Sequence, residues 1–140
     1  MSIIKAIRGY FKKCPLLNGK TINVNYLGED AISYSIEEVP GNLTIKKYTD
    51  GGEMRQKLFH LQSRQTYDKD ILSNEAVSQF FEELTQWVET NNKNKVYPEL
   101  EDELNSLRVE IVTTNYLLSN NDSKARFAIQ FRLVYYKPYN

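Results

Sequence analysis

Residues 125–137 read ARFAIQFRLVYYK, and their side chains alternate in character along the chain. One parity is apolar or aromatic and contains Ala125, Phe127, Ile129, Phe131, Leu133 and Tyr135. The other parity carries Arg126, Gln130 and Arg132. Successive side chains of a β-strand point to opposite faces, so this stretch is predicted to be a long strand with one face in a core. The polar face predicts a contact with a partner.

Over the whole chain, the sequence predicts the order helix, four strands, helix, two strands, and residues 125–137 are the last of these strands. Apolar residues recur at helical spacing in residues 3–13 and 73–91, which predicts two amphipathic helices, and Ser73 is expected to cap the second. The expected strands are residues 21–27, 31–37, 43–49, 55–64, 107–118 and 125–137. The repeated strand–helix alternation of a doubly wound fold is missing. The sequence therefore predicts an α+β fold, an antiparallel (mixed) β-sheet packed by two amphipathic helices.

Three connections are also predicted. Residues 28–30, Gly-Glu-Asp, are expected to form a hairpin loop between the first two strands. Residues 50–52, Asp-Gly-Gly, are a stronger hairpin signal because glycine supplies the positive φ that tight turns need. Residues 119–122 are expected to form the loop before the last strand.

Composition limits the classes of function. A length of 140 residues predicts one domain, residues 1–140, and a net charge of +0 disfavours sequence-wide binding to nucleic acid. The single cysteine, Cys14, allows no internal disulfide and fits a reducing compartment. Residues 1–13 lack the apolar core of a signal peptide, and no apolar run is long enough to cross a bilayer. We therefore expect synthesis in the cytoplasm and no membrane contact.

Residues that could carry chemistry are few. His60 is the only histidine, and a triad or metal site would need partners for it. Cys14 follows the first predicted helix, whose dipole disfavours a thiolate at that end, so we expect an inert thiol. The carboxylates of residues 99–103 lack the pattern of a calcium loop. The expectation is a protein without enzymatic activity, cofactor or metal.

Several strings along the chain carry a resemblance. Residues 34–48 read YSIEEVPGNLTIKKY, and LFHLQSRQTYDKDIL, FFEELTQWVETNN, YPEL and the final strand follow in that order. In order and spacing they resemble a family of small proteins from tail modules of phages and prophages of Gram-positive bacteria, the minor capsid or tail terminator proteins. The resemblance covers about residues 34–137. It departs at Glu38-Val39, at Asp68 and in residues 74–78, which affects turns and a helix start.

The resemblance implies a structural virion protein. A tail terminator forms a ring, usually a homohexamer, that caps the tail tube or sheath at its head-proximal end, ends polymerisation and provides the surface for head attachment. The implied partners are further copies of the chain, the tail tube, the sheath where one exists, and a head-completion or connector protein where a head is present. Nucleic acid is implied only as DNA passing through the ring. The same modules occur in phage-tail-like bacteriocins, so the expected location is the tail of a virion or related particle, assembled in the host cytoplasm.

Two other functions stay open at this point. A head–tail connector protein, from the neck of the particle, has a similar assembly role, and a small-molecule-binding α+β enzyme is a remote alternative that would need a pocket lined by His60 and carboxylates. A ring needs two different patches per subunit. The candidate interface residues around the Asp-Gly-Gly hairpin and on the polar face of the last strand are Lys46, Lys47, Asp50, Arg55, Arg126, Gln130 and Arg132.

Overall fold

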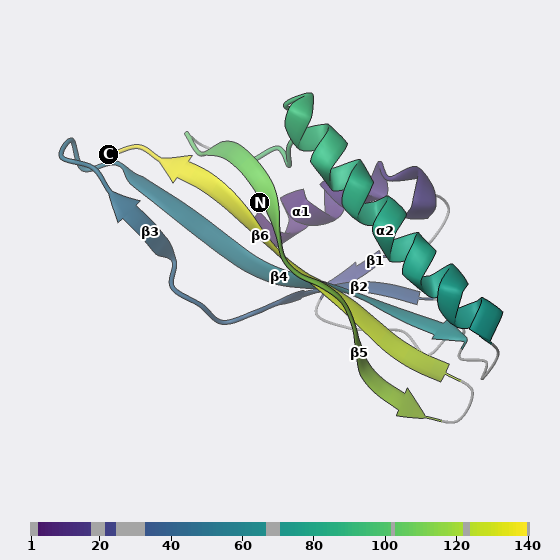
Figure 1. Cartoon of the computed structure of the whole chain (residues 1–140). Coiled ribbons are helices and arrows are strands. Elements are labelled where there is room, and N and C mark those ends of the chain that lie inside the picture. The colour runs from purple at the N-terminus through teal and green to yellow at the C-terminus, as the bar shows by residue number, and fades with distance from the viewer. Residues whose placement is uncertain are drawn as a thin grey trace.

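Two helices cover one face of a mixed β-sheet in the computed structural model of the chain (Figure 1). In chain order the elements are α1 (Ile3–Lys12), the short 3-10 helix η1 (Pro15–Leu17), β1 (Ile22–Val24), β2 (Ser33–Glu38), β3 (Thr44–Lys47), β4 (Glu53–Thr66), α2 (Ile71–Lys93), β5 (Asn105–Asn121) and β6 (Lys124–Lys137). This order confirms the predicted α+β fold, including its helix, four strands, helix, two strands.

The structure describes residues 3–17, 22–24, 33–66, 71–101, 103–121 and 124–139, and within them it leaves aside the side chains of residues 23, 33, 64–66, 71–77, 114–121 and 124–127. The side chain of Arg126 and the predicted turn at residues 28–30 therefore lie outside the described part.

The last strand lies in the interior of the sheet. The strand order is β1-β2-β4-β6-β5, and β3 pairs with the part of β4 that β2 does not cover. β6 pairs antiparallel with β4 from Glu53↔Lys137 to Thr66↔Lys124, and antiparallel with β5 on its other side. A strand with neighbours on both edges satisfies its backbone hydrogen bonds within the sheet. β6, which contains residues 125–137, is thus the strand that joins β4 to β5 in the sheet.

The predicted alternation of β6 is confirmed on its odd-numbered side. Ile129, Phe131 and Leu133 are fully buried, and Tyr135 is nearly so. The even-numbered side differs from the expectation of a continuous polar face, because Val134 is also fully buried there. Val134 stands beside Gln56 of β4 and Arg108 of β5 in the register, so long polar side chains flank it. The second face of the sheet is therefore a mixture of polar and buried apolar positions.

Phe11 of α1 joins the two layers. Its ring lies 5.9 Å from that of Phe59 on β4, 5.5 Å from Phe131 on β6 and 5.8 Å from Trp87 on α2, measured between ring centroids. Phe59 and Phe131 are themselves stacked at 5.5 Å. Aromatic pairs at such distances add to the stabilisation that burial alone provides. The two helices and the sheet therefore share one aromatic core.

The predicted hairpin between the first two strands is wrong. β1 runs parallel to β2, with Ile22 opposite Tyr34 and Val24 opposite Ile36. A short hairpin can join only antiparallel neighbours. Alternation of side chains shows which face of a strand is buried, but it is the same for both strand directions. The sequence pattern therefore predicted the buried face of β1 and gave no information on its direction.

Two predicted boundaries are also wrong. Helix α2 begins at Ile71, so Ser73 lies inside the helix and does not cap it. β5 extends to Asn121 and pairs there with Lys124, so the positions predicted as a loop at residues 119–121 belong to the strand. Polar residues such as Ser and Asn favour turns locally, but pairing with β6 satisfies the backbone of this stretch and outweighs that preference.

The phenol of Tyr10 makes the stability of the fold sensitive to high pH. Tyr10 is 4% exposed, and burial raises the pKa of its hydroxyl to about 12, although the nearby Asn91 side chain lowers this pKa somewhat. Among the described residues, neither the Tyr10 hydroxyl nor the Asn91 side-chain nitrogen has a partner of good hydrogen-bond geometry. The neutral hydroxyl is thus buried without a hydrogen bond of good geometry to offset its loss of contact with water.

We expect stability to fall as the pH rises from about 10 to about 12, because the unfolded phenol ionises in this window and the folded one does not. Two pH units correspond to roughly 2–3 kcal/mol. Tyr10→Phe should leave stability at pH 7 nearly unchanged and reduce this alkaline loss by about that amount, as measured by urea unfolding at several pH values. Equal alkaline losses in both proteins would contradict the assignment.

Candidate assembly surface

The hairpin of β3 and β4 extends beyond the helices, next to the end of β6 (Figure 1). We call residues 43–55 the arm. Its turn follows the Asp-Gly-Gly prediction: Gly51 has φ 90°, and the Gly52 amide donates a hydrogen bond of 2.8 Å to the Asp50 carboxylate. The Asp50 side chain, one of the candidate interface residues, thus stabilises the turn that ends the arm.

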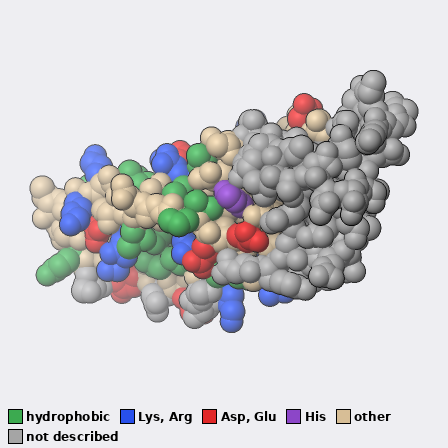
Figure 2. All heavy atoms as spheres, turned by 90° about the horizontal axis from the view of Figure 1, so that it is seen from below, with side chains coloured by type: hydrophobic (Ala, Val, Ile, Leu, Met, Phe, Trp, Pro, Cys, Tyr) green, Lys and Arg blue, Asp and Glu red, His purple; other side chains and the backbone are tan. Residues whose placement is uncertain are grey.

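Apolar and basic side chains lie side by side on the arm. Leu43, Ile45 and Tyr48 are 47%, 41% and 36% exposed, and Lys46 and Lys47 between them are exposed as well. The Lys46 ammonium lies 5.3 Å from the centre of the Tyr48 ring. Figure 2 views the sheet from the side away from the helices and shows hydrophobic side chains among basic ones in its left half. An apolar cluster exposed beside charges is typical of an interaction surface.

Sequence reasoning selected the lysines of the arm and missed Leu43 and Ile45. The sequence pattern places both residues on a strand, and apolar residues on a strand ordinarily face a core. β3 is short and irregular, with a register shift between Thr44 and Lys46, and no helix covers it. The signal in the sequence was the short apolar pair next to two lysines.

Arg55 lies at the base of the arm and has partners within the chain. Its guanidinium is 3.0 Å from the Glu53 carboxylate, which also accepts a hydrogen bond of 2.7 Å from the Thr44 hydroxyl. These two hydrogen bonds, from Thr44 and then Arg55, lower the pKa of Glu53. A hydrogen bond also links Arg55 to Tyr135. Glu53 therefore links β4 to β3, and Arg55 links β4 to β6.

The polar side of β6 takes part in a network of side chains across the sheet. Arg132 is hydrogen-bonded and ion-paired to Glu110 of β5, and it donates a hydrogen bond of 3.1 Å to Gln56 of β4. Arg108 approaches the same Glu110 carboxylate at 2.8 Å. Burial raises the pKa of Glu110, but the hydrogen bonds from Arg108 and Arg132 outweigh this effect and hold it below the usual range. Arg132 thus connects three strands.

A separate set of polar side chains around His60 reaches β2. Burial lowers the pKa of His60, while the nearby Glu37 charge and a hydrogen bond to Gln130 act in the opposite direction. Glu37 in turn accepts a hydrogen bond of 2.7 Å from Gln62, which is almost fully buried. Gln130 therefore contacts the sole histidine of the chain.

The candidate interface residues do not form one patch. Lys46, Lys47, Asp50 and Arg55 come together on the arm. Arg132 pairs with Leu58, three positions along β4 from Arg55, which corresponds to about 10 Å. An odd number of positions along a strand places Arg55 and Arg132 on opposite faces of the sheet. Any interface that includes both would have to wrap around the sheet.

Replacing Arg132 by glutamate is expected to destabilise the fold as well as any interface. The new carboxylate would face Glu110 at the position where the ion pair now lies. The Arg132 side chain is 35% exposed, so we expect a modest loss of about 1–2 kcal/mol. Arg132→Gln removes the charge without adding repulsion and should cost less. Urea unfolding of both variants measures the difference, and an unchanged midpoint for Arg132→Glu would contradict the described network.

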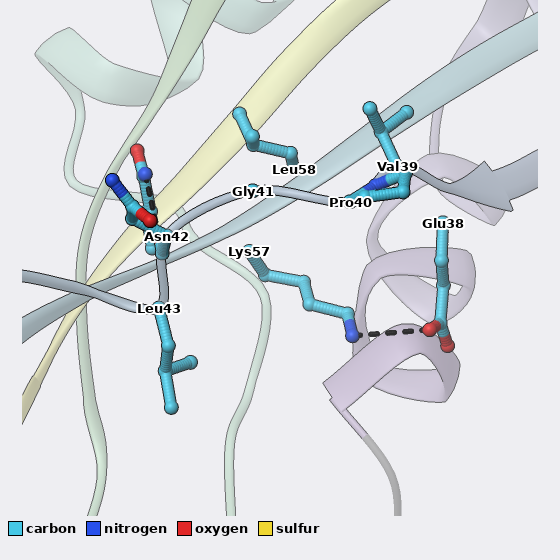
Figure 3. Close-up of a pocket in the computed structure, with 9 residues that line it drawn as sticks. Glu38, Val39, Pro40, Gly41, Asn42, Leu43, Lys57 and Leu58 are labelled. Carbon is cyan, nitrogen blue, oxygen red and sulfur yellow. Dashed lines mark hydrogen bonds and ion pairs between the residues drawn. The ribbon is translucent and has the colours of Figure 1, made fainter.

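A small pocket lies where the chain passes from β2 to β3 (Figure 3). It has a volume of about 310 Å³ and lies between residues 38–43 and residues 56–58 of β4. Gly41 crosses Leu58 so closely that a Cβ at this position would lie 2.2 Å from the leucine side chain. Lys57 and Glu38 form an ion pair of 3.1 Å at one end, as the dashed line in Figure 3 shows. A second and larger pocket of about 620 Å³ lies beside β5.

The residues with possible chemistry are separated from these pockets. His60 lines neither of them. Cys14 is fully buried, and burial raises the pKa of its thiol. Among the residues that the structure describes, no group of three or more His, Cys, Asp or Glu side chains could hold a metal ion.

Within the described ranges, neither α1 nor α2 is long and apolar enough to cross a membrane.

Comparisons with known proteins add no family assignment. No family model matches the chain, and no curated protein shows significant similarity to it.

Proposed function

We propose that this protein is a subunit of a phage tail terminator, which forms a ring at the head-proximal end of a tail tube and ends its polymerisation. The ordered strings of residues 34–137 that resemble this family suggest the role. The structural observation that supports it best is the arm, which presents Leu43 and Ile45 beside Lys46 and Lys47 at one edge of the sheet. Apolar surface of this kind is stabilised when a partner covers it.

The ring requires each subunit to offer two different surfaces. In a closed ring, one patch of a subunit meets a different patch of the next one. The sheet has different strands at its two sides, β3 with β1 on one and β5 on the other. A net charge of +0 avoids strong repulsion between identical subunits. The proposed partners are further copies of the chain, the tail tube, the sheath where present and a head-completion protein where a head exists. DNA would pass through the ring without sequence-specific contact.

Deletion of the gene from its phage or bacteriocin cluster tests the function. Without a terminator the tube keeps growing, so electron micrographs should show tubes longer than wild type and variable in length, and a plasmid copy of the gene should restore one length. Tubes of normal length that fail to join heads would instead identify the protein as a head–tail connector. Normal tails on complete particles would overturn both assembly roles.

A further inference from the structure

The outer edge of β5 carries a groove. The larger pocket, of about 620 Å³, lies between α2 and this edge, and its lining comprises Glu89 and Asn92 of α2, residues 109–112 of β5 and Arg132. β5 is the last strand of the sheet in the described part of the chain. An uncovered edge of a sheet offers backbone donors and acceptors to an added strand. α2 therefore borders the groove on one side, and the free edge of β5 can pair with an extended segment on the other.

Asn92 shows how such a segment would pair. Its side chain donates a hydrogen bond of 2.7 Å to the Val109 carbonyl and accepts one of 3.1 Å from the Val109 amide. The side-chain amide thus occupies the position that the backbone of a neighbouring strand would take. In an antiparallel ladder, outward-pointing backbone groups recur at every second residue. The next outward pair after Val109 belongs to Ile111, beside the groove.

A bulge exposes an apolar side chain at this same place. Ile111 pairs with Phe131 and Thr113 with Gln130, so Val112 is an extra residue in β5. Val112 is 45% exposed. Glu89 is exposed on the neighbouring turn of α2, and Glu110 and Arg132 also line the groove. Because Glu110 is ion-paired with Arg108 and Arg132, the groove combines an apolar side chain with one exposed carboxylate, that of Glu89.

The arm has the complementary features. Leu43 and Ile45 match the apolar position of the groove. Lys46 and Lys47 are successive residues of β3 and point to opposite faces, so Lys46 alone is matched to the Glu89 carboxylate. The arm lies at the opposite side of the sheet from β5, because the order across the sheet is β3, β4, β6, β5. One subunit therefore carries the arm and the groove on opposite edges of its sheet. The two can meet only between different subunits.

We propose that β3 of one subunit lies along the outer edge of β5 in a second copy, at residues 111–113, with Lys46 directed toward Glu89 of that copy. The inference rests on the proposed ring and names its interface. Because the two surfaces differ, each added copy leaves one arm and one groove available until the ring closes.

The two surfaces are staggered along the strands. Thr44 of the arm is level with Arg55, Tyr135 and Ser106, whereas Ile111 is level with Phe131. Four positions along β6 correspond to about 13 Å. Pairing at this stagger tilts the strands against the ring axis, as closed barrels also require.

Cysteine cross-linking tests the proposed contact. Ile45→Cys and Val112→Cys are made in separate proteins, with the fully buried Cys14 retained. After mixing under mild oxidation, we expect a disulfide-linked dimer between the two variants. A single protein with both changes should give a ladder that ends at the size of the ring. Gln79→Cys, exposed on α2 but far from the groove, replaces Val112→Cys as the matched control and should give no dimer with Ile45→Cys.

The outcomes separate the interface from the function. If the unmodified protein forms rings but neither Ile45→Cys nor Leu43→Cys links to Val112→Cys, the proposed contact between β3 and β5 is wrong. The proposed ring is not affected by this result. Equal linking to Gln79→Cys overturns the interface too. If the protein stays monomeric at all concentrations and on tail tubes, both the interface and the proposed function are overturned. Circular dichroism of each variant verifies that it folds before mixing.

Discussion

Phe131→Ala is expected to lower the free energy of unfolding by about 3–5 kcal/mol, the usual cost of removing a buried phenylalanine ring. Phe131 is fully buried at the centre of β6, within 5.5 Å of the rings of both Phe11 and Phe59. Its removal leaves a cavity between α1 and the sheet and deletes two aromatic contacts. Urea or thermal unfolding followed by circular dichroism measures the loss.

Val112→Ala is a suitable control for this prediction because it shortens an apolar side chain on the neighbouring strand β5. Val112 is 45% exposed, so its truncation should change stability by less than about 0.5 kcal/mol. A comparable loss in both variants would mean that the faces of β5 and β6 are assigned incorrectly.

Lys46→Glu combined with Lys47→Glu should reduce self-association by at least about tenfold and leave folding unchanged. Both lysines are exposed on β3, so stability should hardly respond. A glutamate in place of Lys46 would repel Glu89 of a second copy, and like charges across an interface cost several kcal/mol. A factor of ten corresponds to about 1.4 kcal/mol, so tenfold is a conservative expectation. Analytical ultracentrifugation over a range of concentrations measures the change.

The matched control reverses two other neighbouring lysines. Lys12 and Lys13 at the end of α1 are exposed, and their replacement by glutamate changes the net charge by the same amount. This variant should associate like the unmodified protein. Adding Glu89→Lys to the arm variant should restore part of the affinity. Equal losses in the arm and α1 variants would show that net charge matters and the arm does not.

The helices and most strands could be predicted because burial imposes a period on the sequence. Leu84 and Val88 follow helical spacing in α2, and Phe131 and Leu133 follow strand spacing in β6, and all four are fully buried. The direction of β1 could not be predicted, since its alternation of Ile22 and Val24 fits either direction. Local pattern gives the buried face of an element, and the pairing of elements depends on contacts distant in sequence.

The candidate surface was predictable only in part. Lys46 and Lys47 are exposed on the arm, as expected of residues that flank a hairpin. The polar strand face predicts that Arg132 contacts a partner subunit, but Glu110 and Gln56 contact it from both neighbouring strands. These partners are remote in the sequence, and only the register of β4, β5 and β6 reveals them.

Electron microscopy of tails carrying an affinity-tagged copy of this protein would show where its subunits lie on the tail tube. We expect one closed ring of tagged subunits at the end of the tube opposite the baseplate, and none along the tube or at the baseplate. A protein that is absent from purified tails, or that remains monomeric when mixed with them, would contradict this expectation.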